Sequence, residues 1–111
     1  MKIRPSRIRT CTRPWQRIRG LICTQPGPEV LIFPECHDVH TYLMRYAIDI
    51  AFIDKAGQVV SSYRSVGPGC RLRQRGAWAV IERAASRISP WYEQGAYVDA
   101  CVLRAAQGKE G

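Results

Sequence analysis

The sequence has 111 residues, of which 46% are hydrophobic, and it carries a formal net charge of +8. This length corresponds to one domain, and the apolar content suffices for a packed core, which excludes a largely disordered chain. A secretory signal would need an apolar run of about 7–15 residues after its basic residues, and a membrane span about 20. The sequence has neither pattern, so we expect a cytoplasmic protein without membrane insertion.

The positive charge is concentrated at the N-terminal end. Residues 1–20 hold seven basic residues and no acid, whereas residues 21–111 hold ten basic and nine acidic residues. We interpret residues 1–12 as a basic arm, which would attract phosphate groups or acidic surfaces or would only keep the protein in solution. A nucleic-acid interface would use the arginines of this end and of a second group further along: Arg7, Arg9, Arg13, Arg17, Arg19, Arg71, Arg73 and Arg75.

The first half of the chain predicts one short helix and two strands. Residues 1–10 either contain a short edge strand or form an extension without regular structure. Thr12 as N-cap, with Pro14 in the first turn, predicts a short helix. Residues 29–33 form a fully apolar strand that stops at the following proline. From residue 48 apolar side chains fill both faces of an alternating pattern, which predicts a central strand.

The second half contains further strands separated by turns. The predicted segments are, in order, a hairpin turn at residues 54–57 with Gly57 in the left-handed position, its partner strand at 58–64, a break at 67–69, a strand at 77–82, a short helix or turn at 86–93 and a last strand at 97–103. The fold class is therefore mainly β, a compact antiparallel sandwich or barrel with one or two short helices.

We place this single β domain at residues 13–104 and treat residues 105–111 as a flexible C-terminal tail. The five cysteines are widely spaced and form no CxxC pair. Such a set is a poor disulfide framework, so we expect reduced cysteines, several of them packed as small hydrophobic side chains.

Arg45 and Asp49 lie four residues apart inside an otherwise apolar segment. A buried carboxylate is costly unless it is paired, and the planar guanidinium group suits it. One interpretation is an ion-pair network that fixes strand register, with Glu82 as a second carboxylate. The other makes Arg45 an anion-binding group held by the two acids. The binding surface would then comprise His40, Thr41, Met44, Arg45, Asp49 and Glu82.

Cys36, His37 and His40 raise the question of a metal or a nucleophile. A structural zinc site needs four ligands, and the sequence offers no second ligand pair, so we assign no metal and no cofactor. Cys36 and His40 could act as nucleophile and base, but the spacing indicates no third group to orient the base. We assign no catalytic residue, and this pair is kept as an alternative.

An ordered set of short motifs resembles the domain of unknown function 192 family over about residues 17–98. The motifs are Leu31-Ile32-Phe33-Pro34-Glu35-Cys36, Val39-His40-Thr41-Tyr42, Met44-Arg45, Ile48-Asp49, Phe52-Ile53-Asp54 with Gly57, and Val80-Ile81-Glu82. The resemblance implies a jelly-roll-like sandwich and no established activity. The chain departs from the family pattern at Ala47, at Ala85-Ser86 and at Gly95-Ala96.

Three functions follow from these observations. The leading hypothesis is a non-enzymatic β domain that binds a small anionic ligand or a protein partner near His40, Arg45 and Asp49. The first alternative is a nucleic-acid-associated protein that uses the Arg-rich arm. The second alternative is an enzyme centred on Cys36 and His40.

Overall fold

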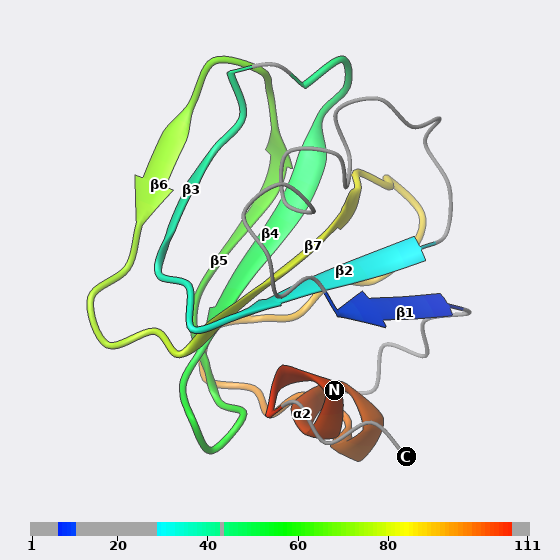
Figure 1. The fold of residues 1–111 in the computed structure, drawn as a ribbon. Coiled ribbons are helices and arrows are strands. Elements are labelled where there is room, and N and C mark those ends of the chain that lie inside the picture. The colour runs from blue at the N-terminus through cyan, green and yellow to red at the C-terminus, as the bar shows by residue number, and fades with distance from the viewer. Residues whose placement is uncertain (1–6, 11–28, 43, 108–111) are drawn as a thin grey trace.

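The computed structural model describes residues 7–10, 29–42 and 44–107, so the helix predicted after Thr12 lies outside the described residues. Within these ranges the chain forms strands and one α-helix (Figure 1): β1 (Arg7–Thr10), β2 (Glu29–Pro34), β3 (Asp38–His40), β4 (Ile48–Ile53), β5 (Val59–Val66), β6 (Arg71–Arg73), β7 (Ala79–Ala84) and α2 (Ala100–Ala106). The predicted mainly β class is confirmed.

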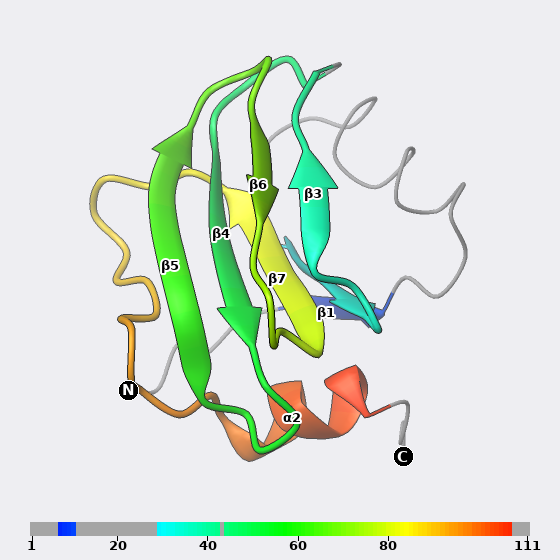
Figure 2. The ribbon, with the colours of Figure 1, turned by 90° about the vertical axis from the view of Figure 1, so that its left-hand side faces the viewer.

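The strands form two sheets. Five of them make an open sheet in the order β1-β2-β7-β4-β5, and β3 pairs with β6 in a separate two-stranded ribbon. All pairs are antiparallel except β1 with β2. The ribbon covers one face of the five-stranded sheet, and α2 packs against the other face near one end (Figures 1 and 2). The result is an open sandwich rather than a closed barrel.

Strand β4 lies between β7 and β5, as its apolar sequence predicts. All six of its residues are buried. Ile48, Ile50 and Phe52 pack toward the ribbon, whereas Ala51 and Ile53 pack toward α2. Because side chains alternate along a strand, one apolar segment supplies both halves of the core.

The predicted hairpin after β4 is confirmed. The Asp54 side chain accepts hydrogen bonds from the backbone N–H groups of Ala56 and Gln58, both at 2.9 Å. Gly57 adopts a backbone φ of +87°, a conformation that residues other than glycine rarely take. A Cβ atom there would also lie 3.2 Å from side-chain atoms of Leu103 and Val98, so the turn packs closely against α2 and the segment that leads into it.

The predicted last strand at residues 97–103 is wrong. Only an isolated bridge joins Tyr97 to Gln58, and helix α2 follows. Its buried residues Val102, Ala105 and Ala106 stand at i, i+3 and i+4, which is helical spacing. The helix extends through Ala106, past the predicted end of the domain at residue 104.

Two other boundaries differ from the prediction. Strand β7 is displaced to Ala79–Ala84 from the predicted 77–82. Strand β1 lies within residues 1–12, where the arm was predicted, and pairs with β2 at the sheet edge, so the edge-strand interpretation of residues 1–10 is confirmed. No helix in the described part of the chain is long and apolar enough to cross a membrane.

Candidate functional site

The buried carboxylate of Asp49 is paired with Arg83, not with Arg45. Asp49 is fully buried on β4, and Arg83 lies directly opposite it on β7. The Arg83 Nε atom donates to Asp49 Oδ2 at 2.9 Å, and the Ser65 backbone N–H donates to Oδ1 at 2.9 Å. A longer bond of 3.4 Å joins the Ser86 N–H to Oδ2. Arg45 is exposed in the bend before β4, outside the sheet, so it cannot take the cross-strand position that Arg83 holds.

Arg83 also holds the segment that follows β7. Its Nη2 atom donates to the Ser89 carbonyl oxygen at 3.1 Å, and its guanidinium group lies 4.6 Å from the centroid of a Trp91 ring. Arg64, on β5, donates to the carbonyl oxygens of Ser86 and Ser89 at 2.6 and 2.8 Å. These contacts make the Asp49–Arg83 pair a structural network that fastens residues 86–91 to the sheet.

Glu82 cannot act together with Asp49. Its neighbour across the strands is Ile50, and adjacent residues of a strand point to opposite faces. Glu82 therefore faces the ribbon side, whereas Asp49 faces the side of Trp91 and α2. The predicted arrangement of one cation between these two carboxylates is wrong, because the sheet separates them.

The other predicted binding residues have different surroundings. Thr41 is buried, and its hydroxyl group donates to the Gly67 carbonyl oxygen at 2.7 Å and accepts from the Cys70 N–H at 2.9 Å. Met44 is half-buried against the core. His40 is exposed at the end of β3 and stacks on Tyr42. The six residues therefore do not form one continuous binding surface.

Cys36 and His40 lie in different environments. Cys36 packs against the core between the two sheets and donates to the Asp38 carbonyl oxygen at 3.3 Å. His40 lies on the exposed side of the ribbon. Among the residues that the structure describes, no group of three or more His, Cys, Asp or Glu side chains is placed to hold a metal ion.

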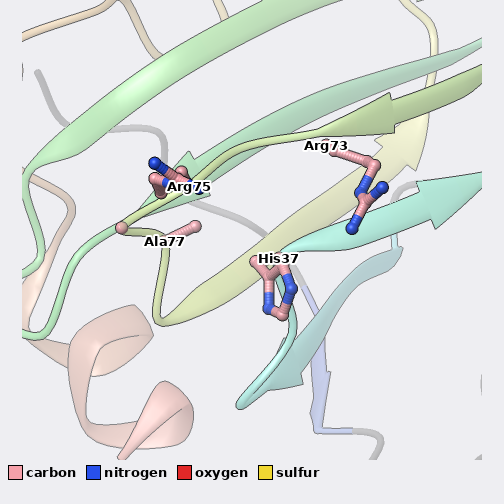
Figure 3. A pocket seen from close by; sticks show the side chains of 5 residues that line it. His37, Arg73, Arg75 and Ala77 are labelled. Atoms are coloured by element: carbon pink, nitrogen blue, oxygen red, sulfur yellow. The ribbon is translucent and has the colours of Figure 1, made fainter.

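A basic cleft lies where β6 leads into β7, beside the start of β3. It has a volume of about 660 Å³ and is lined by His37, Arg73, Arg75, Gly76 and Ala77. Figure 3 shows the Arg73 side chain directed toward His37, with Arg75 farther along the same loop, near Ala77. We call this cleft the basic cleft. It is open to solvent, and its cationic side chains can meet a ligand without rearrangement of the core.

Backbone hydrogen bonds position the cleft residues. The Gln74 N–H donates to the His37 carbonyl oxygen at 2.8 Å, which joins the beginning of β3 to the end of β6. The Ala77 N–H donates to the Gln74 carbonyl oxygen at 3.2 Å and closes a tight turn. Gly76 takes φ +86° in this turn. His37, Arg73 and Arg75 therefore project from a ribbon end with defined geometry.

One carboxylate offsets part of the positive charge around the cleft. Asp38 accepts from Arg71 Nε at 3.1 Å and from Nη2 at 2.7 Å, and Arg73 Nε lies 3.5 Å away. The hydrogen bond with Asp38, and then its charge, raise the pKa of Arg71 above its ordinary value. Within the described part of the chain, Arg75 has no acidic partner. Three guanidinium groups and one carboxylate leave a local charge of +2, without counting His37.

Arg73 and Arg75 were predicted as part of a nucleic-acid interface, whereas His37 was not predicted as part of a binding site. The signal that could have found the cleft is the alternation of Arg71, Leu72 and Arg73. It indicates a strand with one basic face and one apolar face, and Leu72 indeed packs inward. The residues next to His37 in the sequence do not indicate that it lies beside β6, because only the pairing of β3 with β6 brings His37 close to this strand.

The N-terminal arginines are only partly described. Arg9 is exposed on β1, and Arg7 lies on the same strand. Arg13, Arg17 and Arg19 lie outside the described residues. Strand β1 belongs to the five-stranded sheet and β6 to the ribbon, so the two basic groups are carried by separate sheets.

Comparison with known proteins gives one family and two similar folds. The model of the family DUF192, described as "Uncharacterized ACR", matches residues 2–97. A crystal structure of "a putative transcription regulator" from Sinorhizobium meliloti is similar, with a TM-score of 0.61 and 20% sequence identity. The match covers 70% of this chain and 67% of the chain in that structure. A protein of unknown function from Novosphingobium aromaticivorans has a TM-score of 0.60 and 20% identity, with 71% and 63% coverage. No curated protein matches the chain.

Proposed function

The chain belongs to the DUF192 family of uncharacterised proteins, and we propose that it is a non-enzymatic β domain that binds an anionic group in the basic cleft. The group is a phosphate or a carboxylate of a small ligand or partner. The observation that carries the proposal is the convergence of His37, Arg73 and Arg75 on one open cleft of about 660 Å³.

The chemistry of the cleft favours an oxyanion. A guanidinium group presents paired N–H donors that match the geometry of a carboxylate or phosphate, and such charge-assisted hydrogen bonds are among the strongest in proteins. Arg75 has no acidic partner among the described residues, and Arg73 has only the 3.5 Å approach to Asp38. An incoming oxyanion would supply the acceptors that these two side chains lack.

This location replaces the predicted face around His40, Arg45 and Asp49. The Asp49 carboxylate already accepts from Arg83 and from two backbone N–H groups, so its function is structural. The basic cleft lies at the other end of β3 from His40. The enzyme alternative loses support because Cys36 is partly buried against the core while His40 faces solvent.

Nucleic acid is the second candidate ligand class. The observation that favours it is the row Arg71, Arg73 and Arg75, which places cations at every second position along an exposed edge. Phosphates of a nucleic acid and of a small ligand present the same oxygens to such a row. The two similar crystal structures support the fold only, because each is 20% identical to this chain.

Isothermal titration of the full chain with inorganic phosphate, and separately with acetate, tests the proposal. We expect Arg75→Ala to weaken phosphate binding by about tenfold, the typical effect of losing a charged hydrogen bond. Arg104→Ala, which removes an exposed cation from α2, is the matched control and should bind as the unaltered protein does. If Arg75→Ala binds phosphate with the same affinity as the unaltered protein, the basic cleft is not the phosphate-binding site.

A further inference from the structure

The exposed face of the β3–β6 ribbon carries aromatic rings as well as cations. In β3, Val39 is buried while Asp38 and His40 point outward, and in β6, Leu72 packs inward between Arg71 and Arg73. The register places Asp38 opposite Arg73 and His40 opposite Arg71. These four side chains form the outer face of the ribbon, toward which Figure 2 looks.

Tyr42 extends this face beyond the end of β3. Its ring stacks on that of His40, with centroids 5.1 Å apart and an interplanar angle of 17°. Tyr42 is 56% exposed despite this stack. Single exposed apolar side chains are common on protein surfaces, so the Tyr42 ring is informative only because it lies beside the cations of the same ribbon face. More than half of the surface of Tyr42 remains accessible to a further planar group.

The ribbon therefore has an aromatic end and a cationic end. Tyr42 and His40 lie at one end, and the basic cleft with His37, Arg73 and Arg75 lies at the other, with Arg71 between them across from His40. A strand rises about 3.3 Å per residue, so His37 and His40 are separated by roughly 10 Å along β3. This distance corresponds to about three phosphate-to-phosphate spacings of a stacked strand, at about 3.4 Å each along its axis.

We infer that this face binds single-stranded nucleic acid, with phosphates along Arg71, Arg73 and Arg75 and a base stacked on Tyr42. The inference rests on the proposed function, because the phosphate is the anionic group that the basic cleft would take. Proteins that bind single strands combine a basic track with aromatic rings on which bases stack. An acidic protein segment would use the same charges but would have no planar group for the exposed Tyr42 ring.

The test is fluorescence anisotropy of a labelled ten-nucleotide thymidine strand titrated with the full chain. A strand of equal length and charge without bases serves as the probe for backbone binding alone, and a hexaglutamate peptide serves as the probe for an acidic protein segment. We expect Tyr42→Ala to weaken binding of the thymidine strand by about tenfold. The same variant should leave binding of the baseless strand and of inorganic phosphate unchanged.

Three variants make the result specific. Tyr42→Phe keeps the ring and should bind the thymidine strand as the unaltered protein does. Tyr97→Ala removes another exposed tyrosine, on the segment before α2, and should have no effect. Arg75→Ala should weaken binding of both strands and of phosphate, because it removes a charge from the basic cleft.

Several outcomes would overturn the inference. One is that the thymidine strand and the baseless strand bind with equal affinity and that Tyr42→Ala changes neither affinity. Another is binding that is lost when Arg13, Arg17 and Arg19 are replaced by glutamine but is insensitive to Tyr42→Ala and Arg75→Ala. Equal affinity for hexaglutamate would assign the face to an acidic protein instead. If Tyr42→Ala leaves binding of the thymidine strand unchanged but Arg75→Ala still weakens phosphate binding, the proposed function stands and the inference of nucleic-acid binding does not.

Discussion

Asp49 and Arg83 face each other across β4 and β7, with 2.9 Å between Asp49 Oδ2 and Arg83 Nε, on the side of the sheet that packs against Trp91 and α2. The pair lies 34 residues apart in sequence and is almost completely buried. Its network with Arg64, Ser86 and Ser89 joins three strands to the segment after β7. The buried charges of this domain thus stabilise its fold, while the anion-binding proposal depends on the exposed charges of the ribbon.

Removal of one member of the Asp49–Arg83 pair should be strongly destabilising. Asp49→Ala leaves the Arg83 guanidinium group buried without its carboxylate, a change that typically costs about 3–5 kcal/mol. We expect the free energy of unfolding, measured by urea denaturation, to fall by that amount. The double variant Asp49→Ala with Arg83→Met removes both charges and should be more stable than Asp49→Ala alone. Because Arg83 also contacts Ser89 and Trp91, the Arg83→Met single variant completes a double-mutant cycle, and a coupling energy of zero between the two positions would contradict a structural role for the pair.

Thr41 should contribute to stability through its hydroxyl group. Thr41→Val removes the donor to the Gly67 carbonyl oxygen and the acceptor for the Cys70 N–H while it keeps the shape of the side chain. Loss of a buried hydrogen-bond partner typically costs about 1–3 kcal/mol. We expect urea denaturation to show this loss for Thr41→Val and a smaller one for Thr41→Ser, which retains the hydroxyl group. Equal losses for the two variants would show that packing, not hydrogen bonding, determines the role of Thr41.

The Tyr92 hydroxyl group should make the protein sensitive to alkaline pH. Burial, and then the charge of Asp99, raise the pKa of Tyr92 above its ordinary value of 10.0. The unfolded chain therefore loses this proton at lower pH than the folded chain, so the free energy of unfolding decreases as pH rises above about 10. Below that pH the contribution is fully present. We expect Tyr92→Phe to reduce this decrease in denaturation experiments at increasing pH.

A control for the Tyr92 experiment comes from neutral pH. The Tyr92 hydroxyl oxygen is buried and has no hydrogen-bond partner in the described structure, so its removal should not destabilise the protein at pH 7. A large loss of stability for Tyr92→Phe at pH 7, or an unchanged slope above pH 10, would contradict this account.

Local patterns in the sequence were sufficient for part of the fold. The alternation from Ile48 to Ile53 identified a central strand with two apolar faces, because alternation is a property of the strand itself. The left-handed position of Gly57 followed in the same way from local turn chemistry. The segment at residues 97–103 was misassigned because its first residues suit a strand, whereas the helical spacing of Val102, Ala105 and Ala106 becomes visible only over a window that reaches Ala106.

The candidate site depends on contacts between distant segments. Arg45 was the nearest cation to Asp49 in sequence, but Arg83 is the cation opposite it in the sheet. Proximity along the chain could not show this, because strand register decides which side chains meet. His37 and Arg75 likewise meet only through the pairing of β3 with β6. The sequence therefore identified the basic residues of β6 without identifying the cleft that they line.

Binding of an oxyanion in the basic cleft can be observed by an amide-shift NMR titration of the full chain with inorganic phosphate. We predict the largest shifts at Gln74, Gly76 and Ala77, with saturation as phosphate is added and loss of these shifts in Arg75→Ala. Shifts centred instead on Ser65 and Ser86, whose N–H groups bind Asp49, or a spectrum that does not respond to phosphate, would contradict this prediction.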